Sequence, residues 1–138
     1  HNPKYIKDLI AQIESGYDIV IGSRFIKRTG YDQTFFRMLG INIISGIIKF
    51  MTNQKIYDTT SGFRAVNRNI IEEFSESYPY DYPEPCTNMS MIQKGYKVKE
   101  VPVKMNNRTT GISSISKIKS IGYMLKVTLF LIIKGIVD

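Results

Sequence analysis

Residues that bind transition metals or form disulfide bridges are nearly absent from this sequence. Its 138 residues include one cysteine, Cys86, and one histidine, His1. A single cysteine cannot form an internal disulfide, and these two side chains are too few for a zinc site. These counts exclude a disulfide-stabilised or zinc-finger class of protein, and a reducing compartment suits the chain.

Acidic residues are also in the minority. The chain has 12 Asp and Glu against 19 Lys and Arg, which gives a net charge of +7. This balance favours an acidic partner: a nucleic acid, an anionic lipid or a phosphorylated ligand. The basic residues are dispersed and the aromatic residues do not interleave with them, a pattern that argues against nucleic acid.

Helix and strand patterns alternate along the chain and predict an α/β fold. Asn2 and Pro3 start a helix whose apolar residues recur at helical spacing until Gly16 ends it. A β-branched run at 18–22 predicts a buried strand. Further helices are expected at 34–51, 67–74 and 87–94, strands at 63–66 and 96–105, and a turn at 78–85. Pro102 favours an edge position for the last strand.

The final segment, 116–137, predicts a long apolar helix with three lysines, Lys119, Lys126 and Lys134. These lysines project within roughly 80° of one another, because an α-helix turns about 100° per residue. Charges spread along the segment argue against a membrane span. We therefore expect a catalytic part at 1–114 and an amphipathic membrane-interface helix at 115–138, with helix 34–51 lying beside it. Alternatively, both helices simply pack on the sheet or on each other.

Four polar segments offer candidate functional residues. Arg24 follows the first strand, where ligands bind in open α/β sheets, and its guanidinium suits a phosphate. The loop 58–64 leads into a strand, and Glu84 stands between two prolines at a helix start. Arg108 and Ser113 lie in a polar loop that could hold a diphosphate. Each also has an ordinary interpretation, as a surface arginine, a turn, a helix N-terminal acid or a plain loop.

Taken in order, these segments resemble the family-2 glycosyltransferases, in the branch of the dolichyl- and polyprenyl-phosphate sugar transferases. The motifs are Ile21-Gly22-Ser23-Arg24, Asp58-Thr59-Thr60-Ser61-Gly62-Phe63-Arg64, Gly95-Tyr96-Lys97-Val98 with Glu100-Val101-Pro102-Val103, and Arg108 with Gly111, Ser113 and Ser114. The opening His1-Asn2-Pro3 resembles the tail of that family's D-A-D-G-Q-H-x-P motif.

The resemblance implies the C-terminal part of a GT-A domain, with a Rossmann-like mixed sheet, a nucleotide-sugar donor and Mg²⁺ or Mn²⁺ in the full-length parent. The metal-binding aspartates would lie just before His1, so no metal and no independent activity are expected for this part. The residue roles that it implies are these: Arg24 and Arg37 on the acceptor phosphate, Asp58 and Glu84 in catalysis, and Ser61, Gly62, Arg108 and Ser113 at the donor.

Two departures from the family's pattern bear on the acceptor. Cys86 stands where the family's P-E-P-E segment has its second Glu, and Ile112 stands where it has Lys. A sugar hydroxyl needs a base to remove its proton, whereas a lipid phosphate is already anionic near pH 7. The loss of Glu therefore favours a phosphate acceptor, although it could equally mark an inactive copy.

The expected function is transfer of a sugar from a nucleotide-diphosphate sugar to a polyprenyl phosphate, or to a related membrane-borne glycan acceptor. It would take place at the cytoplasmic face of a bacterial cell membrane, in cell-wall or polysaccharide synthesis, by a protein that could form a homo-oligomer. The alternatives are a basic nucleic-acid-binding module and a membrane-docked, non-catalytic module.

Overall fold

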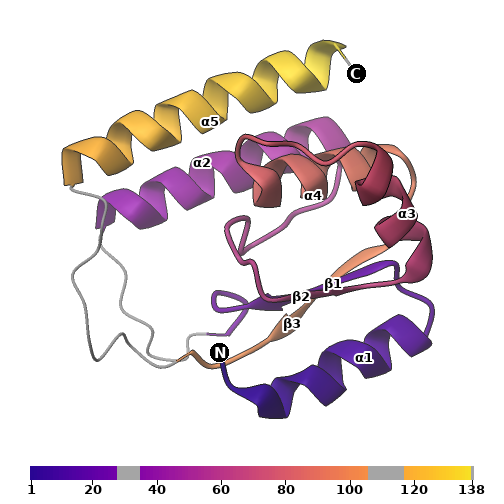
Figure 1. Ribbon diagram of the computed structural model, residues 1–138. Coiled ribbons are helices and arrows are strands. Elements are labelled where there is room, and N and C mark those ends of the chain that lie inside the picture. Colours follow the sequence, from indigo (N-terminus) through magenta and orange to yellow (C-terminus); the bar gives the residue numbers. More distant parts are fainter. Residues whose placement is uncertain (28–34, 106–116, 138) are drawn as a thin grey trace.

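A three-stranded mixed sheet lies between one helix on one face and a layer of helices on the other (Figure 1). The computed structural model describes residues 1–27, 35–105 and 117–137. Strand β1 (Ile19–Ser23) is central, antiparallel to β2 (Arg64–Val66) and parallel to β3 (Val98–Pro102). The predicted α/β class and the mixed sheet are confirmed, and the architecture is compatible with part of a GT-A domain.

The helix α1 (Ile6–Glu14) covers one face of the sheet. It follows a short 3₁₀ turn, η1 (Pro3–Tyr5), whose start is capped by the side chain of Asn2. Leu9 packs there in a small core formed with valines of β1 and of the β3 segment. The predicted first helix is confirmed, and its apolar spacing exists because one side faces this sheet.

The other face carries α2 (Phe35–Thr52), α3 (Arg68–Glu76) and α4 (Pro83–Gln93). The main core lies between these helices and the sheet. Helix α4 begins four residues before the predicted helix, so the expected turn over 78–85 is wrong at its end. The reason is local, because Pro83 occupies the first helical turn, where its fixed φ and missing N–H cost nothing.

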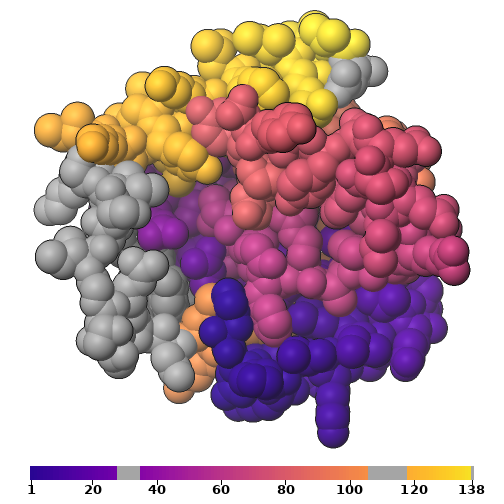
Figure 2. Space-filling view, in the orientation of Figure 1, coloured from indigo at the N-terminus to yellow at the C-terminus, as the bar shows by residue number. Residues whose placement is uncertain are grey.

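The last helix, α5 (Lys117–Val137), forms an outer layer over α2 and α4 (Figures 1 and 2). Gly40 of α2 faces Met124 of α5, and Gly135 of α5 faces Met51 of α2. Because both pairs run in the same chain direction, the two helices are parallel. A glycine in each pair leaves room for a methionine, and small residues of this kind allow helices to approach closely.

Candidate functional site

A buried ion pair stands at the carboxyl end of β1. The Nε and Nη2 atoms of Arg24 donate to the two carboxylate oxygens of Asp58 at 2.8 Å each, and the Arg24 backbone N–H donates to the same group at 3.0 Å. The Arg24 side chain is 8% exposed and that of Asp58 is 0% exposed. A second hydrogen bond joins Nη2 to the Thr60 hydroxyl. The pair therefore holds the predicted polar loop against the end of the central strand.

Glu100 of β3 anchors the same loop from the other side. Its two carboxylate oxygens accept the backbone N–H groups of Tyr57 at 3.0 Å and Asp58 at 2.8 Å. Burial raises the pKa of Glu100, and the two backbone hydrogen bonds oppose that shift. Glu100 thus holds the backbone of the loop, while the Asp58 side chain holds the loop to Arg24.

Ser61 and Gly22 explain why the loop can lie so close to β1. The Ser61 hydroxyl donates to the Gly22 carbonyl at 2.7 Å, and the Gly22 N–H donates to the Phe63 carbonyl at 2.7 Å. A Cβ on Gly22 would lie 2.6 Å from Phe63 Cδ1, so the close approach of Phe63 to β1 requires glycine at this position. The hydroxyl of Ser61 is used within the fold, whereas Gly62 is exposed at the surface of the loop.

Glu84 faces this loop from the first turn of α4. Its Oε1 atom lies 3.7 Å from the position of a Cβ built on Gly62, so the carboxylate and the loop backbone are neighbours. Arg64 of β2 donates from Nη1 to the Thr87 hydroxyl at 2.8 Å, one helical turn after Pro83. Burial lowers the pKa of Arg64, and the charge of Glu84 opposes that shift.

Arg64 is a site residue to which the sequence assigned no role. It lies in a predicted strand and is the last residue of the 58–64 motif. Residue type alone therefore does not identify it as part of the site. The signal is a charged residue inside a predicted strand, where the structure makes its side chain partly buried. A guanidinium that is partly buried beside Glu84 gives this carboxylate a nearby positive charge.

The remaining predicted residues lie apart from this cluster or outside the described structure. Arg37 is exposed in the first turn of α2 and, among the described residues, has no hydrogen-bond or ion-pair partner. Arg108 and Ser113 lie outside the described residues, so their predicted donor contacts stay predictions. The ring of His1 stacks on Phe63 with ring centroids 4.8 Å apart, which places this exposed residue beside the loop.

Two buried polar side chains near these groups have no partner in the described part of the chain. They are the Thr59 hydroxyl, next to Asp58, and both polar atoms of the Asn88 amide, one turn after Glu84. Within the same residues, no group of three or more His, Cys, Asp and Glu side chains could hold a metal ion. The catalytic, acceptor and donor roles predicted for these residues stay predictions.

Sequence comparisons relate the chain to glycosyltransferases. No protein-family model matches it. It is similar to the polyprenol monophosphomannose synthase of Mycolicibacterium smegmatis, with 27% identity over 84% of this chain and 45% of the relative. It is also similar to the dolichol-phosphate mannosyltransferase of Pyrococcus furiosus, with 33% identity over 83% of this chain and 33% of the relative. The chain thus spans less than half the length of each of these relatives.

Proposed function

We propose that the protein transfers a sugar from a nucleotide sugar to a polyprenyl phosphate at a membrane surface. The names of both relatives join a polyprenol or dolichol phosphate with mannose. The observation that carries the choice of a lipid acceptor is the exposed apolar surface of α2 and α5. The helices that carry this surface and the loop at 58–62 belong to one α/β body. A phosphate carried by a membrane lipid can therefore reach the loop in this proposal.

We call this surface the apolar band. Its members are large apolar side chains of α2 and α5 that point away from the core, among them Phe50 at 89% and Leu129 at 60% exposed. The others are Phe35, Phe36, Leu39, Ile43, Ile118, Ile121, Leu125, Ile132, Ile133 and Ile136. So many exposed apolar side chains on two neighbouring helices mark an interaction site, and a lipid bilayer is a partner that suits helices of this length.

Lysines border the apolar band. Helical spacing of about 100° per residue places Lys49 beside the outward face of α2, and Lys126 beside that of α5 on the opposite border. Cations that flank an apolar face suit a helix lying in the interface of an anionic membrane. Both helices are also long and apolar enough to cross a membrane, with mean hydropathies of 1.4 and 1.7. We favour the interface because both also pack on the α/β body.

The proposed chemistry needs no base for the acceptor, because a phosphate monoester is mostly ionised at pH 7. Arg24 stands at the end of β1 with its charge paired to Asp58, and Arg37 supplies an exposed positive charge at the start of α2. In this proposal Asp58 acts through Arg24, since it is fully buried and accepts hydrogen bonds from the guanidinium. Glu84 faces the exposed backbone of Gly62 and would border the reacting groups.

The donor half of the reaction rests on the resemblance alone. Ser61 shapes the loop through its hydrogen bond to β1, and Gly62 leaves the backbone open to a ligand. Mg²⁺ or Mn²⁺ would neutralise the diphosphate, and the described residues include no group of three or more His, Cys, Asp and Glu that could hold it.

Acceptor kinetics on the full-length protein test the proposal. Arg37→Ala should raise the KM for polyprenyl phosphate, because loss of one charge-assisted hydrogen bond costs about 1.5–3 kcal/mol, or roughly 10- to 100-fold. The KM for the nucleotide sugar should stay within about twofold, since the lost bond belongs to the acceptor. Lys49→Ala removes the same charge from the same helix and serves as the control.

Two results would contradict the proposal. An acceptor KM that responds equally to Arg37→Ala and Lys49→Ala would show that Arg37 acts only through the general field of the surface. A full-length protein that binds membranes but transfers no sugar would instead support the membrane-docked, non-catalytic alternative. The observation that favours this alternative is Cys86, which stands where the family has glutamate.

A further inference from the structure

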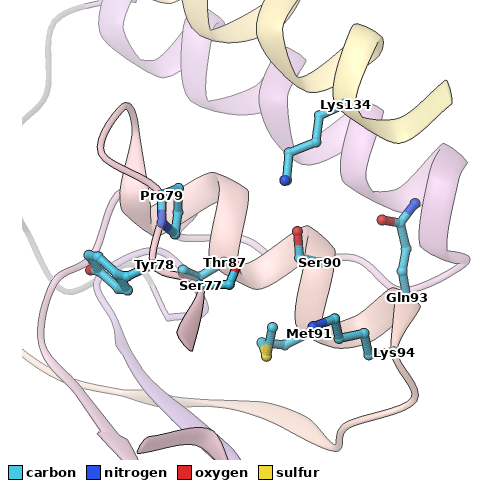
Figure 3. A pocket seen from close by; sticks show the side chains of 9 residues that line it. All are labelled: Ser77, Tyr78, Pro79, Thr87, Ser90, Met91, Gln93, Lys94 and Lys134. Carbon is cyan, nitrogen blue, oxygen red and sulfur yellow. The ribbon is translucent and has the colours of Figure 1, made fainter. Parts of the chain in front are cut away.

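A hollow of about 490 Å³ lies between α4, α5 and the segment that precedes α4 (Figure 3). Its charged lining residues are Lys94 and Lys134. Lys94 pairs with Glu73, and Lys134 also interacts within the protein. The hollow therefore gives no reason to expect a charged ligand. Thr87 lines it from α4, and the Thr87 hydroxyl is bound by a different cation, Arg64, which does not line the hollow.

Arg64 is half-buried and uses few of its hydrogen-bond donors. A guanidinium carries several N–H groups in a planar fork. Among the described residues, it donates from Nη1 to the Thr87 hydroxyl at 2.8 Å and to no other acceptor. Thr87 itself donates to the Pro83 carbonyl at 2.6 Å, so α4 fixes this end of the guanidinium. Donors that burial separates from water need a further acceptor.

Glu84 stands one helical turn before Thr87 and does not pair with Arg64. Neither charged side chain forms an ion pair in the part of the chain that the structure describes. Their charges are nonetheless near each other, because burial lowers the pKa of Arg64 and the charge of Glu84 opposes that shift. Helix residues three apart have Cβ atoms about 5–6 Å apart. This spacing leaves room for one small group between the carboxylate and the guanidinium.

Gly62 keeps the Glu84 carboxylate accessible from outside. It is exposed, and a Cβ built on it would have one neighbour within 4 Å among the described residues, Glu84 Oε1 at 3.7 Å. A side chain at this position would cover the carboxylate, whereas glycine lets a ligand approach closely. Arg64 follows two residues later and also faces α4, through its bond to Thr87.

Asn88 adds an amide on the same side of α4. It follows Glu84 by four residues, a spacing that places both side chains on one helix face, and helix side chains lean toward the N-terminus. The Asn88 side chain therefore leans toward Glu84. It is 0% exposed, and neither its Nδ2 nor its Oδ1 has a hydrogen-bond partner in the described structure. A buried amide without partners destabilises a fold, so a group that donates and accepts is expected beside it.

A hydroxyl group suits these three side chains better than a phosphate does. It accepts from the guanidinium, donates to the carboxylate, and bonds an amide in either direction. A phosphate carries acceptor oxygens and negative charge, so the Glu84 carboxylate would repel it. The acceptor of the proposed reaction is a lipid phosphate. Hydroxyl groups beside the loop would therefore belong to the sugar of the donor.

We propose that Arg64 and Glu84 bind hydroxyl groups of the transferred sugar, with Asn88 holding an ordered water beneath them. Arg64 donates to a sugar oxygen, Glu84 accepts from a sugar hydroxyl, and the exposed backbone of Gly62 borders the sugar. The water satisfies the Asn88 amide, as buried waters do for polar groups without protein partners. The inference rests on the proposed function and deepens it, because it makes Arg64 and Glu84 determinants of sugar specificity.

Calorimetry on the full-length protein tests the proposal. The probes are GDP-, UDP- and dTDP-linked hexoses with Mg²⁺, each compared with its own bare nucleoside diphosphate. Arg64→Met and Glu84→Ala should each weaken binding of the nucleotide sugar roughly 10- to 100-fold, the share of a hydrogen bond to a charged group. Binding of the bare diphosphate should stay within about twofold, since the lost bonds belong to the sugar. This second ligand also shows that each variant is folded.

Matched controls come from the exposed ion pair on α3. Arg68→Met and Glu72→Ala remove the same charges from a pair that lies on the helix surface. Both should leave the affinity for the nucleotide sugar and for the bare diphosphate unchanged. A loss in these variants as large as that in Arg64→Met and Glu84→Ala would reduce the effect to the net charge of the protein and overturn the subsite.

Asn88→Leu provides a second measurement. Leucine has a similar volume and no polar atoms, so urea unfolding should show equal or greater stability than wild type. Affinity for the nucleotide sugar should fall about fivefold, the share of one neutral hydrogen bond. Lower stability in Asn88→Leu would show that the fold itself needs the amide, and unchanged sugar affinity would remove Asn88 from the subsite.

The remaining outcomes separate this subsite from the proposed function. If Arg64→Met weakens the bare diphosphate as much as the nucleotide sugar, Arg64 holds the diphosphate and the hydroxyl assignment is wrong. If wild type transfers sugar but Arg64→Met and Glu84→Ala bind the nucleotide sugar as wild type does, the function stands and the subsite does not. If wild type binds no nucleotide sugar, the proposed function itself fails, and the subsite fails with it.

Discussion

The buried pair of Arg24 and Asp58 allows a quantitative test of the fold around the site. Asp58→Asn keeps the shape of the side chain but removes its charge, and it replaces one acceptor oxygen with a donor. Arg24 donates three N–H groups to this carboxylate, at 2.8–3.0 Å. Removing one partner of a buried ion pair costs about 3–5 kcal/mol, because the other charge stays buried without compensation. That is a large part of the roughly 5–15 kcal/mol by which a domain is stable.

An exposed ion pair in the same chain provides the control. Arg68 and Glu72 meet across one turn of α3 at 3.2 Å, with side chains 89% and 65% exposed. Arg68→Gln should cost no more than about 0.5 kcal/mol, and high salt should reduce that small effect further. The loss caused by Asp58→Asn should persist in high salt because solvent does not reach the pair.

Urea unfolding followed by far-ultraviolet circular dichroism measures both effects, which suits a chain without tryptophan. A double-mutant cycle with Arg24→Met and Asp58→Leu then isolates the pair energy from the loss of each side chain. The double variant should be more stable than Asp58→Asn, because both charges leave the interior together. A loss from Asp58→Asn as small as that from Arg68→Gln would refute a structural role for the pair.

Two further changes test the same region. Burial raises the pKa of Glu100 above its ordinary value of 4.5, so its contribution to stability is full below that value and is lost as pH rises through the raised pKa. Glu100→Gln should flatten this part of the pH profile of urea unfolding, and an unchanged profile would contradict the assignment. Gly22→Ala should cost about 1–3 kcal/mol, because the new Cβ meets Phe63. In the same assay Gly46→Ala, with nothing within 4 Å, should be neutral or stabilising, and equal losses would argue against a steric cause.

Local patterns were enough to find most helices and strands of the described structure. Apolar spacing located α1, and a β-branched run located β1 to within one residue at each end. Each of these elements is buried against its neighbours, so the spacing of its apolar residues indicates whether it is a helix or a strand. The start of α4 was missed because a proline-rich segment looks like a turn, although Pro83 begins the helix. Prolines alone do not distinguish a helix start from a turn.

Pairing between distant residues could not be predicted in the same way. Arg24 and Asp58 were both singled out, but for separate roles in acceptor binding and catalysis. Their contact spans 34 positions in the chain and depends on how β1 and the loop meet. Lys134 was placed in one stripe with Lys119 and Lys126 from helical spacing. Lys134 lies on the side of α5 that faces α4, because α5 packs on both α2 and α4, and spacing within one helix cannot show this.

Tyr82 shows how the outer layer and the candidate site depend on each other. This residue directly precedes α4 and has a φ of 51°, a conformation that costs energy for any residue with a Cβ. Its ring packs edge-on against Tyr123 at 5.1 Å and Phe130 at 6.0 Å, both on α5. Such aromatic pairs contribute about 0.5–1.5 kcal/mol each beyond their buried area, which is enough to offset the strain. Glu84 lies two residues after Tyr82. The packing of α5 on Tyr82 therefore determines where this carboxylate points.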